Sequence, residues 1–220
     1  MMSFVRSGLR RLYARRDRHR LNLRSFGSRE ALRQHLGPGI SAHGWMIGEW
    51  SYGYPEVAGA GEAPLTIGRY TSIAQGCRIL LGHEHNSHWI STFPFPAAPD
   101  IFPSSVGISG HPFSRGAVKI GNDVWIGEDV TILSGAQIGD GVIIGAKSLV
   151  RGTHPPDSII GGVPARIIRF RFNFQQIEQL LRIRWWDWDD HAVSRIIPDL
   201  CSSRIDEFLE QYRKRPGDQD

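Results

Sequence analysis

Residues 120–155 read IGNDVWIGEDVTILSGAQIGDGVIIGAKSLVRGTHP and divide into six consecutive hexads. Every hexad opens on a branched apolar residue, and its fifth position is Val, Ala, Ser or His. The first positions are Ile120, Ile126, Ile132, Ile138, Ile144 and Val150. An amphipathic helix needs apolar residues three and four apart, and a half-buried strand needs them two apart. A step of six therefore favours a short strand followed by a turn, repeated along the chain.

The repeat predicts an all-β fold, a parallel β-helix with three short strands in each coil. Three hexads make a triangular coil of about 18 residues, and stacked coils rise by the roughly 4.8 Å that separates neighbouring strands. The Ile column fills the interior, while Gly, Asn and Asp occupy corners where the backbone φ is often positive. The same phase recurs earlier at Ile67, Ile73 and Ile79, so we expect the β-helix to span residues 41–170.

The repeat is interrupted over residues 83–116, which open within the stretch GHEHNSHWISTFPF at 82–95. Four prolines precede Ser104, and no six-residue period continues through the segment. Irregular segments of this length within a compact domain are usually functional or disordered. Because this one is rich in aromatic residues, we expect an ordered loop that protrudes from the β-helix and packs against a partner.

The two ends of the chain differ from the repeat. Residues 171–220 place apolar residues three and four apart, which predicts a C-terminal helical segment. Residues 1–40 form a basic N-terminal arm, with a short helix expected over 28–36. Within this arm, residues 1–24 hold eight Arg and one Asp. Three alternatives stay open for them: weak contact with an anionic membrane surface as an amphipathic helix, a disordered leader, or a mis-assigned start.

The charge distribution and the cysteine content bear on possible partners and on the cellular location. The net charge is +4, but the arm accounts for the excess and the remainder is slightly acidic, so we expect no nucleic-acid binding. The two cysteines, Cys77 and Cys201, match no metal-ligand spacing, which suits a reducing compartment. A transmembrane helix needs about 18 consecutive apolar residues, and no stretch of the sequence approaches that length. With no secretory signal pattern, the expected location is the cytoplasm.

Three features of the chain occur together in one known family. The hexads are followed by IIGGVPARIIRFRF at 159–172, the loop contains HEHNSHWISTFPF at 83–95, and the helical segment contains WWDW at 185–188. The combination resembles the hexapeptide-repeat acyltransferases of the xenobiotic class, the chloramphenicol and streptogramin type. It implies a left-handed parallel β-helix and a homotrimer with active sites between subunits. It also implies acetyl-CoA as co-substrate and a small-molecule or saccharide acceptor.

Acetyl transfer to an alcohol needs a base near neutral pKa, and imidazole, with an ordinary pKa of about 6.5, is the natural choice. The resemblance assigns this role to His85, within Glu84-His85-Asn86. No serine or cysteine nucleophile motif is present, so direct transfer in a ternary complex is favoured over an acyl-enzyme. His83 and His88 lack such motif support, and we assign His88 to the acceptor site. A structural or exposed histidine without a catalytic role is the alternative for each.

The resemblance also assigns residues of the repeat to the acetyl-CoA site. The ring of Trp125 is expected beside the transferred acetyl group, and the guanidinium groups of Arg166 and Arg169 suit the phosphates. Small residues are expected to let the pantetheine arm approach the backbone, at Gly127, Gly135, Gly145 and Ala146. A filled corner would explain the ring of Trp125, turn packing would also explain the glycines, and a solvated face would explain the arginines, so these alternatives stay open.

The acceptor site is expected at WSYGYPEV, residues 50–57, where Tyr52 and Tyr54 offer rings for a sugar or an antibiotic. The family usually has Tyr where this chain has Trp50. This departure and the basic arm favour a sugar hydroxyl, on a polysaccharide or lipid-linked precursor, over an antibiotic.

Two other functions compete with acetyl transfer. The spacing His-x-His-x-x-His at 83–88 could place two zinc ligands on one turn, and γ-type carbonic anhydrases also have a left-handed β-helix. Their ligands lie on separate coils, however, and they lack the WWDW and STFPF features, so no metal is expected here. A catalytically silent trimeric scaffold is the third hypothesis, which the complete histidine loop and GGVPAR disfavour.

Overall fold

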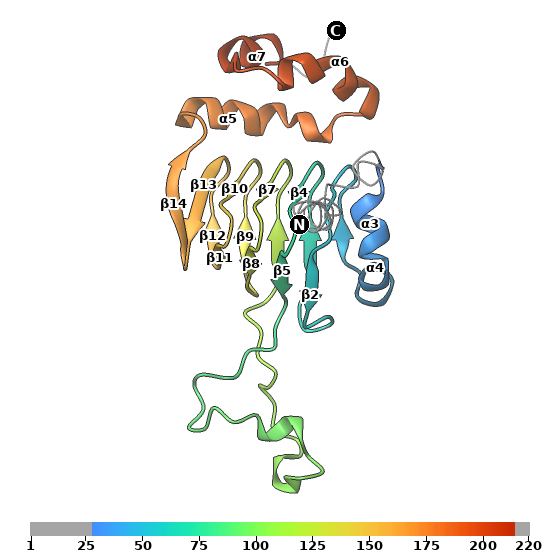
Figure 1. Ribbon diagram of the computed structural model, residues 1–220, viewed down its shortest axis with the longest axis vertical. Coiled ribbons are helices and arrows are strands. Elements are labelled where there is room, and N and C mark those ends of the chain that lie inside the picture. The colour runs from blue at the N-terminus through green and yellow to red at the C-terminus, as the bar shows by residue number, and fades with distance from the viewer. Residues whose placement is uncertain (1–27, 214–220) are drawn as a thin grey trace, which may run out of the picture.

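The computed structural model describes residues 28–213, so the arm over residues 1–24 lies outside the described part of the chain. The first elements are two short helices, α3 (Ala31–His35) and α4 (Gly37–His43), which stand at the N-terminal end of the β-helix (Figure 1). Gly39 in α4 packs directly under the ring of Trp45, where an added Cβ would come within 2.0 Å of the indole. A glycine is therefore needed for this helix to cover the first coil.

Short strands follow and form three sheets. Their bounds are β1 (Met46–Ile47), β2 (Glu56–Ala58), β3 (Leu65–Ile67), β4 (Ser72–Ile73), β5 (Arg78–Leu80), β6 (Val118–Ile120), β7 (Trp125–Ile126), β8 (Thr131–Ile132), β9 (Gln137–Ile138), β10 (Ile143–Ile144), β11 (Leu149–Val150), β12 (Thr153–His154), β13 (Ser158–Gly162) and β14 (Ala165–Phe170). Sheet A has the order β1-β3-β6-β9-β12, sheet B β4-β7-β10-β13-β14, and sheet C β2-β5-β8-β11. From β3 to β13 the chain visits the three sheets in turn, and each strand pairs in parallel with the strand one coil on, as β6 does with β9. The chain therefore winds as a three-sided parallel β-helix (Figure 1).

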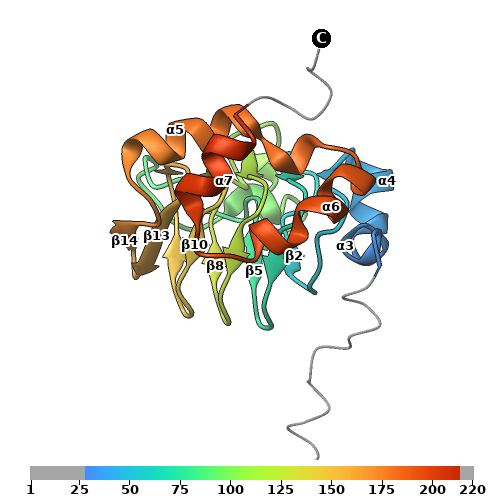
Figure 2. The same ribbon diagram turned by 90° about the horizontal axis from the view of Figure 1, so that it is seen from above.

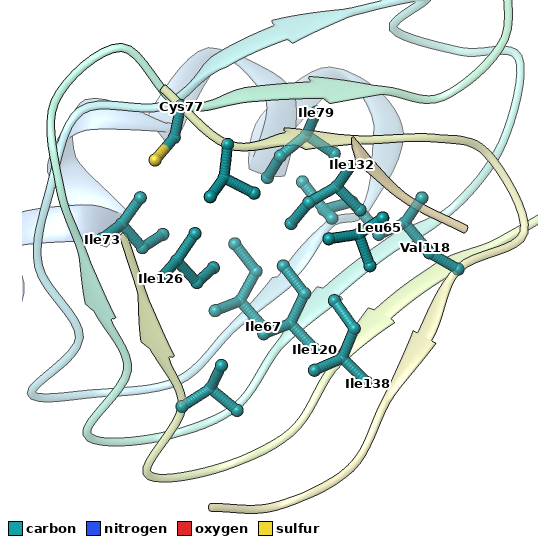
Figure 3. Close-up of a cluster of buried hydrophobic side chains, with 14 of the residues drawn as sticks. Leu65, Ile67, Ile73, Cys77, Ile79, Val118, Ile120, Ile126, Ile132 and Ile138 are labelled. Atoms are coloured by element: carbon teal, nitrogen blue, oxygen red, sulfur yellow. The ribbon is translucent and has the colours of Figure 1, made fainter. Parts of the chain in front are cut away.

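The hexads build the interior of this β-helix. From Ile120 to Val150, the first and fifth positions are all at most 4% exposed. Their side chains stack coil upon coil, and Figure 3 shows the column together with the buried thiol of Cys77. Burying a side chain of this size contributes about 1.5–3 kcal/mol to folding. The repeat therefore supplies the main hydrophobic core.

The corners take residues that tolerate a left-handed backbone. Asp123, Asp129 and Asp157 have φ between 53° and 55°. A short polar side chain can accept this conformation because it hydrogen-bonds locally. Lys147, with φ of 60°, is a larger residue than Asp at a corner of this kind. Its Nζ donates a hydrogen bond to Asp129 at 2.6 Å. Corner geometry thus explains the Asp and Gly content of the hexads.

Sheet B ends in a hairpin, because β14 turns back and pairs antiparallel with β13. The chain then forms α5 (Phe174–Ile183), the 3-10 turn η4 (Trp185–Asp187), α6 (Asp190–Leu200) and α7 (Ile205–Gln211). These helices form a cap along one side of the β-helix (Figures 1 and 2). Arg69, at the corner between sheets A and B, donates from Nη1 to the carbonyl oxygens of Trp186 and Trp188 at 2.6 and 3.1 Å. The WWDW stretch therefore joins the cap to the β-helix.

The segment between β5 and β6 leaves the β-helix and is drawn in green in Figure 1. Its regular structure consists of two 3-10 turns, η2 (Phe95–Ala97) and η3 (Pro103–Ser105). Because β5 belongs to sheet C and β6 to sheet A, the loop emerges at the corner between those sheets. No helix within residues 28–213 is long and apolar enough to cross a membrane.

Candidate active site

Glu84 anchors the loop where it leaves the β-helix. Its backbone N–H and C=O form hydrogen bonds of 3.1 and 2.7 Å with Phe113, on the returning limb of the loop (residues 110–113). Its carboxylate accepts hydrogen bonds from the Ser134 hydroxyl at 2.7 Å and from Arg115 Nε at 3.1 Å. The two limbs of the loop are thus tied to each other and to the β-helix one residue before His85.

His85 has an exposed side chain whose orientation is set by a hydrogen bond. Its Nδ1 lies 2.6 Å from the carbonyl oxygen of Thr92. Since a carbonyl oxygen can only accept, Nδ1 carries the proton of the neutral ring and Nε2 carries the free lone pair. This is the tautomer that a general base acting through Nε2 requires.

The three histidines of the segment do not share a centre. Nε2 of His83 lies 3.1 Å from the carboxylate of Glu62, which also accepts the His83 backbone N–H at 2.7 Å. His88 is exposed, and its backbone N–H donates to the side chain of Asn86 at 3.0 Å. Among residues 28–213, no three His, Cys, Asp or Glu side chains are grouped so that they could hold a metal ion.

A fourth histidine, His111, lies beside His85 and is not among the residues that the sequence suggests. The two ring centroids are 5.1 Å apart and the planes stand at 88°. Nδ1 of His111 is buried and makes no hydrogen bond within the described chain. A long irregular segment separates the two histidines, so no periodicity or spacing rule pairs them.

The outer part of the loop is held by aromatic rings and exposes apolar side chains. Phe95 packs against Phe93 and Phe102, with ring centroids 4.8 and 5.0 Å apart. The exposed apolar side chains include Ile90, Ile101, Val106 and Ile108. Apolar groups gathered on one exposed segment usually mark an interaction surface. The loop is therefore suited to pack on another protein surface.

One row of residues crosses the outer face of sheet B. By strand register it runs Tyr52, Ser72, Trp125, Ile143, Ile159 and Arg169. Trp125 is 56% exposed, and the two isoleucines beyond it are half-buried. Five steps at the spacing of neighbouring strands make the row about 24 Å long. The fold thus aligns three residues that the sequence assigns separately to the acceptor and donor sites: Tyr52, Trp125 and Arg169.

Within one chain, this row and His85 lie on different sides of the β-helix. The loop emerges at the corner between sheets C and A, whereas Trp125 faces outward from sheet B. A single chain therefore does not bring the imidazole and the row together.

The small residues assigned to the acetyl-CoA site fall at two corners. Gly127, Gly145 and Ala146 lie between sheets B and C, whereas Gly135 lies between sheets C and A, against the Arg115 carbonyl. A Cβ on Gly127 would come within 2.7 Å of the Ala146 nitrogen, so coil stacking itself requires this glycine. A Cβ on Gly145 would meet nothing closer than 3.4 Å. Gly145 and the exposed Ala146 thus leave room along the edge of sheet B.

The remaining assigned residues, and Trp50 at the position where the family usually has Tyr, have the following neighbours. Trp50 donates from its indole nitrogen to Asp190 at 2.9 Å, so it ties the first coil to the cap. Tyr54 is 58% exposed and packs edge-on against His35 at 5.2 Å. Arg166 and Arg169, both on β14, are exposed, and neither makes an ion pair within the described chain.

The buried thiol of Cys77 is unsuited to act as a nucleophile. Its Sγ lies 3.2 Å from the carbonyl oxygen of Gly127 in the core. Burial raises the pKa of this thiol to about 11, so the reactive thiolate is not formed near neutral pH.

Comparison with known proteins points to one class of enzyme. The family model described as "Bacterial transferase hexapeptide (six repeats)" matches residues 117–152. The chloramphenicol acetyltransferase of Agrobacterium fabrum is 37% identical over 155 residues, which cover 70% of this chain and 74% of the relative. A probable macrolide acetyltransferase of Lysinibacillus sphaericus is 39% identical over 69% of this chain and 85% of the relative. A putative lipopolysaccharide biosynthesis O-acetyl transferase of Escherichia coli is 43% identical over 48% of this chain and 50% of the relative.

Proposed function

Because this chain belongs to the hexapeptide-repeat acetyltransferases of the xenobiotic class, we propose that it transfers the acetyl group of acetyl-CoA to a hydroxyl of a small-molecule or saccharide acceptor. The chain is an acyltransferase. The observation that carries it is the hydrogen bond from His85 Nδ1 to the Thr92 carbonyl, which leaves Nε2 as a base.

His85 is the general base in the proposed reaction. Its Nε2 takes the proton of the acceptor hydroxyl while the hydroxyl oxygen attacks the thioester carbonyl. A C–O bond forms and the C–S bond breaks. The imidazolium then returns its proton to the departing thiolate, so His85 ends neutral and no acyl-enzyme is formed. The Thr92 carbonyl stabilises the imidazolium between these steps, because it accepts the Nδ1–H throughout.

The row across sheet B is the proposed donor track. Arg169 and Arg166 bind the phosphates of acetyl-CoA, since exposed guanidinium groups suit phosphate oxygens. The half-buried Ile143 and Ile159 line the pantetheine arm, and the exposed ring of Trp125 packs beside the acetyl group. Gly145 and Ala146 border the same edge without blocking it.

The proposed assembly is a homotrimer of left-handed β-helices with the active sites between subunits. Two observations support it. His85 and Trp125 lie on different sides of one chain, so a second copy is needed to unite them. The loop that carries His85 also exposes apolar side chains suited to a protein surface. The loop of one subunit then presents His85 to sheet B of its neighbour.

The proposed acceptor is an alcohol that packs on Tyr52 and Tyr54, with His88 near its polar groups. Trp50 is not assigned to this lining, because its indole N–H donates to Asp190 and ties it to the cap. The names of the relatives cover chloramphenicol, a macrolide and lipopolysaccharide biosynthesis. Both antibiotics and saccharides are therefore included as acceptors in the test. The proposed location of the enzyme is the cytoplasm.

The test measures release of free thiol from acetyl-CoA over a panel of chloramphenicol, a macrolide, monosaccharides and polysaccharide precursors. The wild type is expected to release thiol only with an accepted alcohol, and His85→Ala is expected to lower kcat by about 10²–10⁴-fold. His191→Ala, on the exposed face of α6, is the matched control and should retain full activity. No acceptor-dependent release, or full activity of His85→Ala, would contradict the proposal. Stoichiometric zinc with carbon dioxide hydration would favour the hydratase instead.

A further inference from the structure

The returning limb of the loop, residues 110–113, lies along the segment that carries His85. At one end, Glu84 and Phe113 exchange two backbone hydrogen bonds. At the other end, Gly110 is so close to Asn86 and Trp89 that an added Cβ would come within 3.3 Å of each. The limb is therefore held against this segment at both ends, with His111 between the two contacts.

His111 is the side chain of this limb that meets the ring of His85. The two rings pack edge to face, with 5.1 Å between their centroids and 88° between their planes. The hydrogen bond to Thr92 fixes the position of Nδ1 but does not by itself fix the plane of the ring. A second ring packed at right angles restricts rotation of that plane.

The His111 side chain is half-buried, and burial of one of its ring nitrogens has a free-energy cost. Its Nδ1 is buried and has no hydrogen-bond partner within the described chain. A buried polar atom without a partner is destabilising, and such an atom in a native protein calls for an explanation. An apolar ring would fill the same space without this cost. A Phe ring at this position therefore separates the packing contact with the proposed base from the nitrogen atoms of His111.

We propose that His111 is a positioning residue for His85. It holds the imidazole plane in the orientation in which Nδ1–H meets the Thr92 carbonyl and Nε2 is presented to the acceptor. His111 acts through His85 and does not touch the reacting atoms. This inference rests on the proposed role of His85 as the base.

The kinetic test uses His111→Ala, His111→Phe, His85→Ala and the double variant H85A/H111A, with the best acceptor of the panel. His111→Ala is expected to lower kcat about tenfold while the KM for acetyl-CoA stays unchanged, because a misplaced base slows the chemical step and leaves donor binding intact. His111→Phe keeps a ring at the contact and is expected to restore most of kcat. The double variant is expected to be no slower than His85→Ala, since positioning an absent base has no effect.

A second readout needs no acceptor. Nitrogen NMR of ¹⁵N-histidine-labelled protein reports which ring nitrogen of His85 carries the proton. The wild type and His111→Phe are expected to show the Nδ1–H tautomer, and His111→Ala a mixture of both tautomers. His191→Ala is again the control, because its ring lies on the cap.

The outcomes separate this inference from the proposed function. Wild-type kcat and an unchanged tautomer in His111→Ala would overturn the positioning role while leaving His85 as the base. A double variant slower than His85→Ala would overturn it too, because His111 would then act independently. Full activity of His85→Ala would instead overturn the proposed function.

Discussion

Asp157 is a buried carboxyl group in a cluster of charges at the corner between sheets A and B. Its side chain is 5% exposed and lies 3.0 Å from Nη1 of Arg171, which is also 3.5 Å from Asp123. Burial raises the pKa of Asp157 to about 6, while Arg171 opposes the rise and Asp123 and Asp140 add to it. This single residue therefore links folding stability to pH.

Asp157→Asn is expected to flatten part of that pH dependence. The pKa is higher in the folded than in the unfolded chain, so the stability that Asp157 contributes is complete below about pH 4 and is lost as the pH rises through about 6. A shift of this size corresponds to a free energy on the order of 2–3 kcal/mol. In denaturant titrations, the stability of the variant relative to wild type should rise by this order between pH 4 and 7.

Asn is a suitable replacement because it tolerates the φ of 53° at this corner. Asp100→Asn, in the exposed part of the loop, is the matched control and should follow the wild-type curve. Parallel pH profiles for wild type and Asp157→Asn would show that the buried carboxyl group is not the source of the effect.

At the scale of elements, Asp190 at the start of α6 joins three parts of the chain. Its carboxylate accepts hydrogen bonds from Trp50 Nε1 at 2.9 Å and Arg69 Nη2 at 3.0 Å. It also pairs with Arg29, which precedes α3, at 3.1 Å. The cap, the first coil and the N-terminal helices are thus held by one side chain.

Asp190→Ala is expected to destabilise the protein by about 2 kcal/mol, because the indole N–H of Trp50 and Nη2 of Arg69 lose their hydrogen-bond acceptor. Thermal or chemical unfolding measures the loss. Glu210→Ala removes an exposed pair with Arg213 on the same cap and should cost less than about 0.5 kcal/mol. Equal losses in the two variants would refute a special role for Asp190.

Some elements of the fold can be predicted from the sequence and others cannot. The β-helix follows from local periodicity, since each hexad repeats the same inward residue and the same corner, as at Ile126 and Asp129. The junction of Trp50 with Asp190 does not, because the contact spans most of the chain and has no periodic signal. The antiparallel return of β14 likewise depends on a turn after the last coil rather than on the repeat.

The sequence suggests candidate members of the site but not how they are arranged. The motif around His85 indicates a candidate base, but the tautomer of its ring depends on the Thr92 carbonyl, which only the folded loop supplies. Tyr52, Trp125 and Arg169 lie far apart in the sequence, and strand register alone sets them on one row. His111 was missed because contacts inside an irregular loop follow no spacing rule.

At the scale of the whole molecule, the exposed apolar face of the loop is expected to hold the trimer together. Ile101→Asp places a charge on this face, and burying an unpaired charge in an interface is strongly unfavourable. Sedimentation should show a wild-type mass of three chains and a smaller mass for the variant at low protein concentration. Ile197→Asp, at an exposed apolar position of α6, is the control and should remain trimeric. A monomeric wild type would contradict the assembly.

Complementation between two impaired variants tests whether His85 of one subunit serves the donor track of another. His85→Ala keeps sheet B intact, and Trp125→Ala keeps the loop intact. Co-expressed in equal amounts, they should form mixed trimers in which about one interface in four pairs an intact loop with an intact sheet B. Acceptor-dependent thiol release is then expected at about a quarter of the wild-type rate. Activity no greater than the mean of the two variants alone would contradict it.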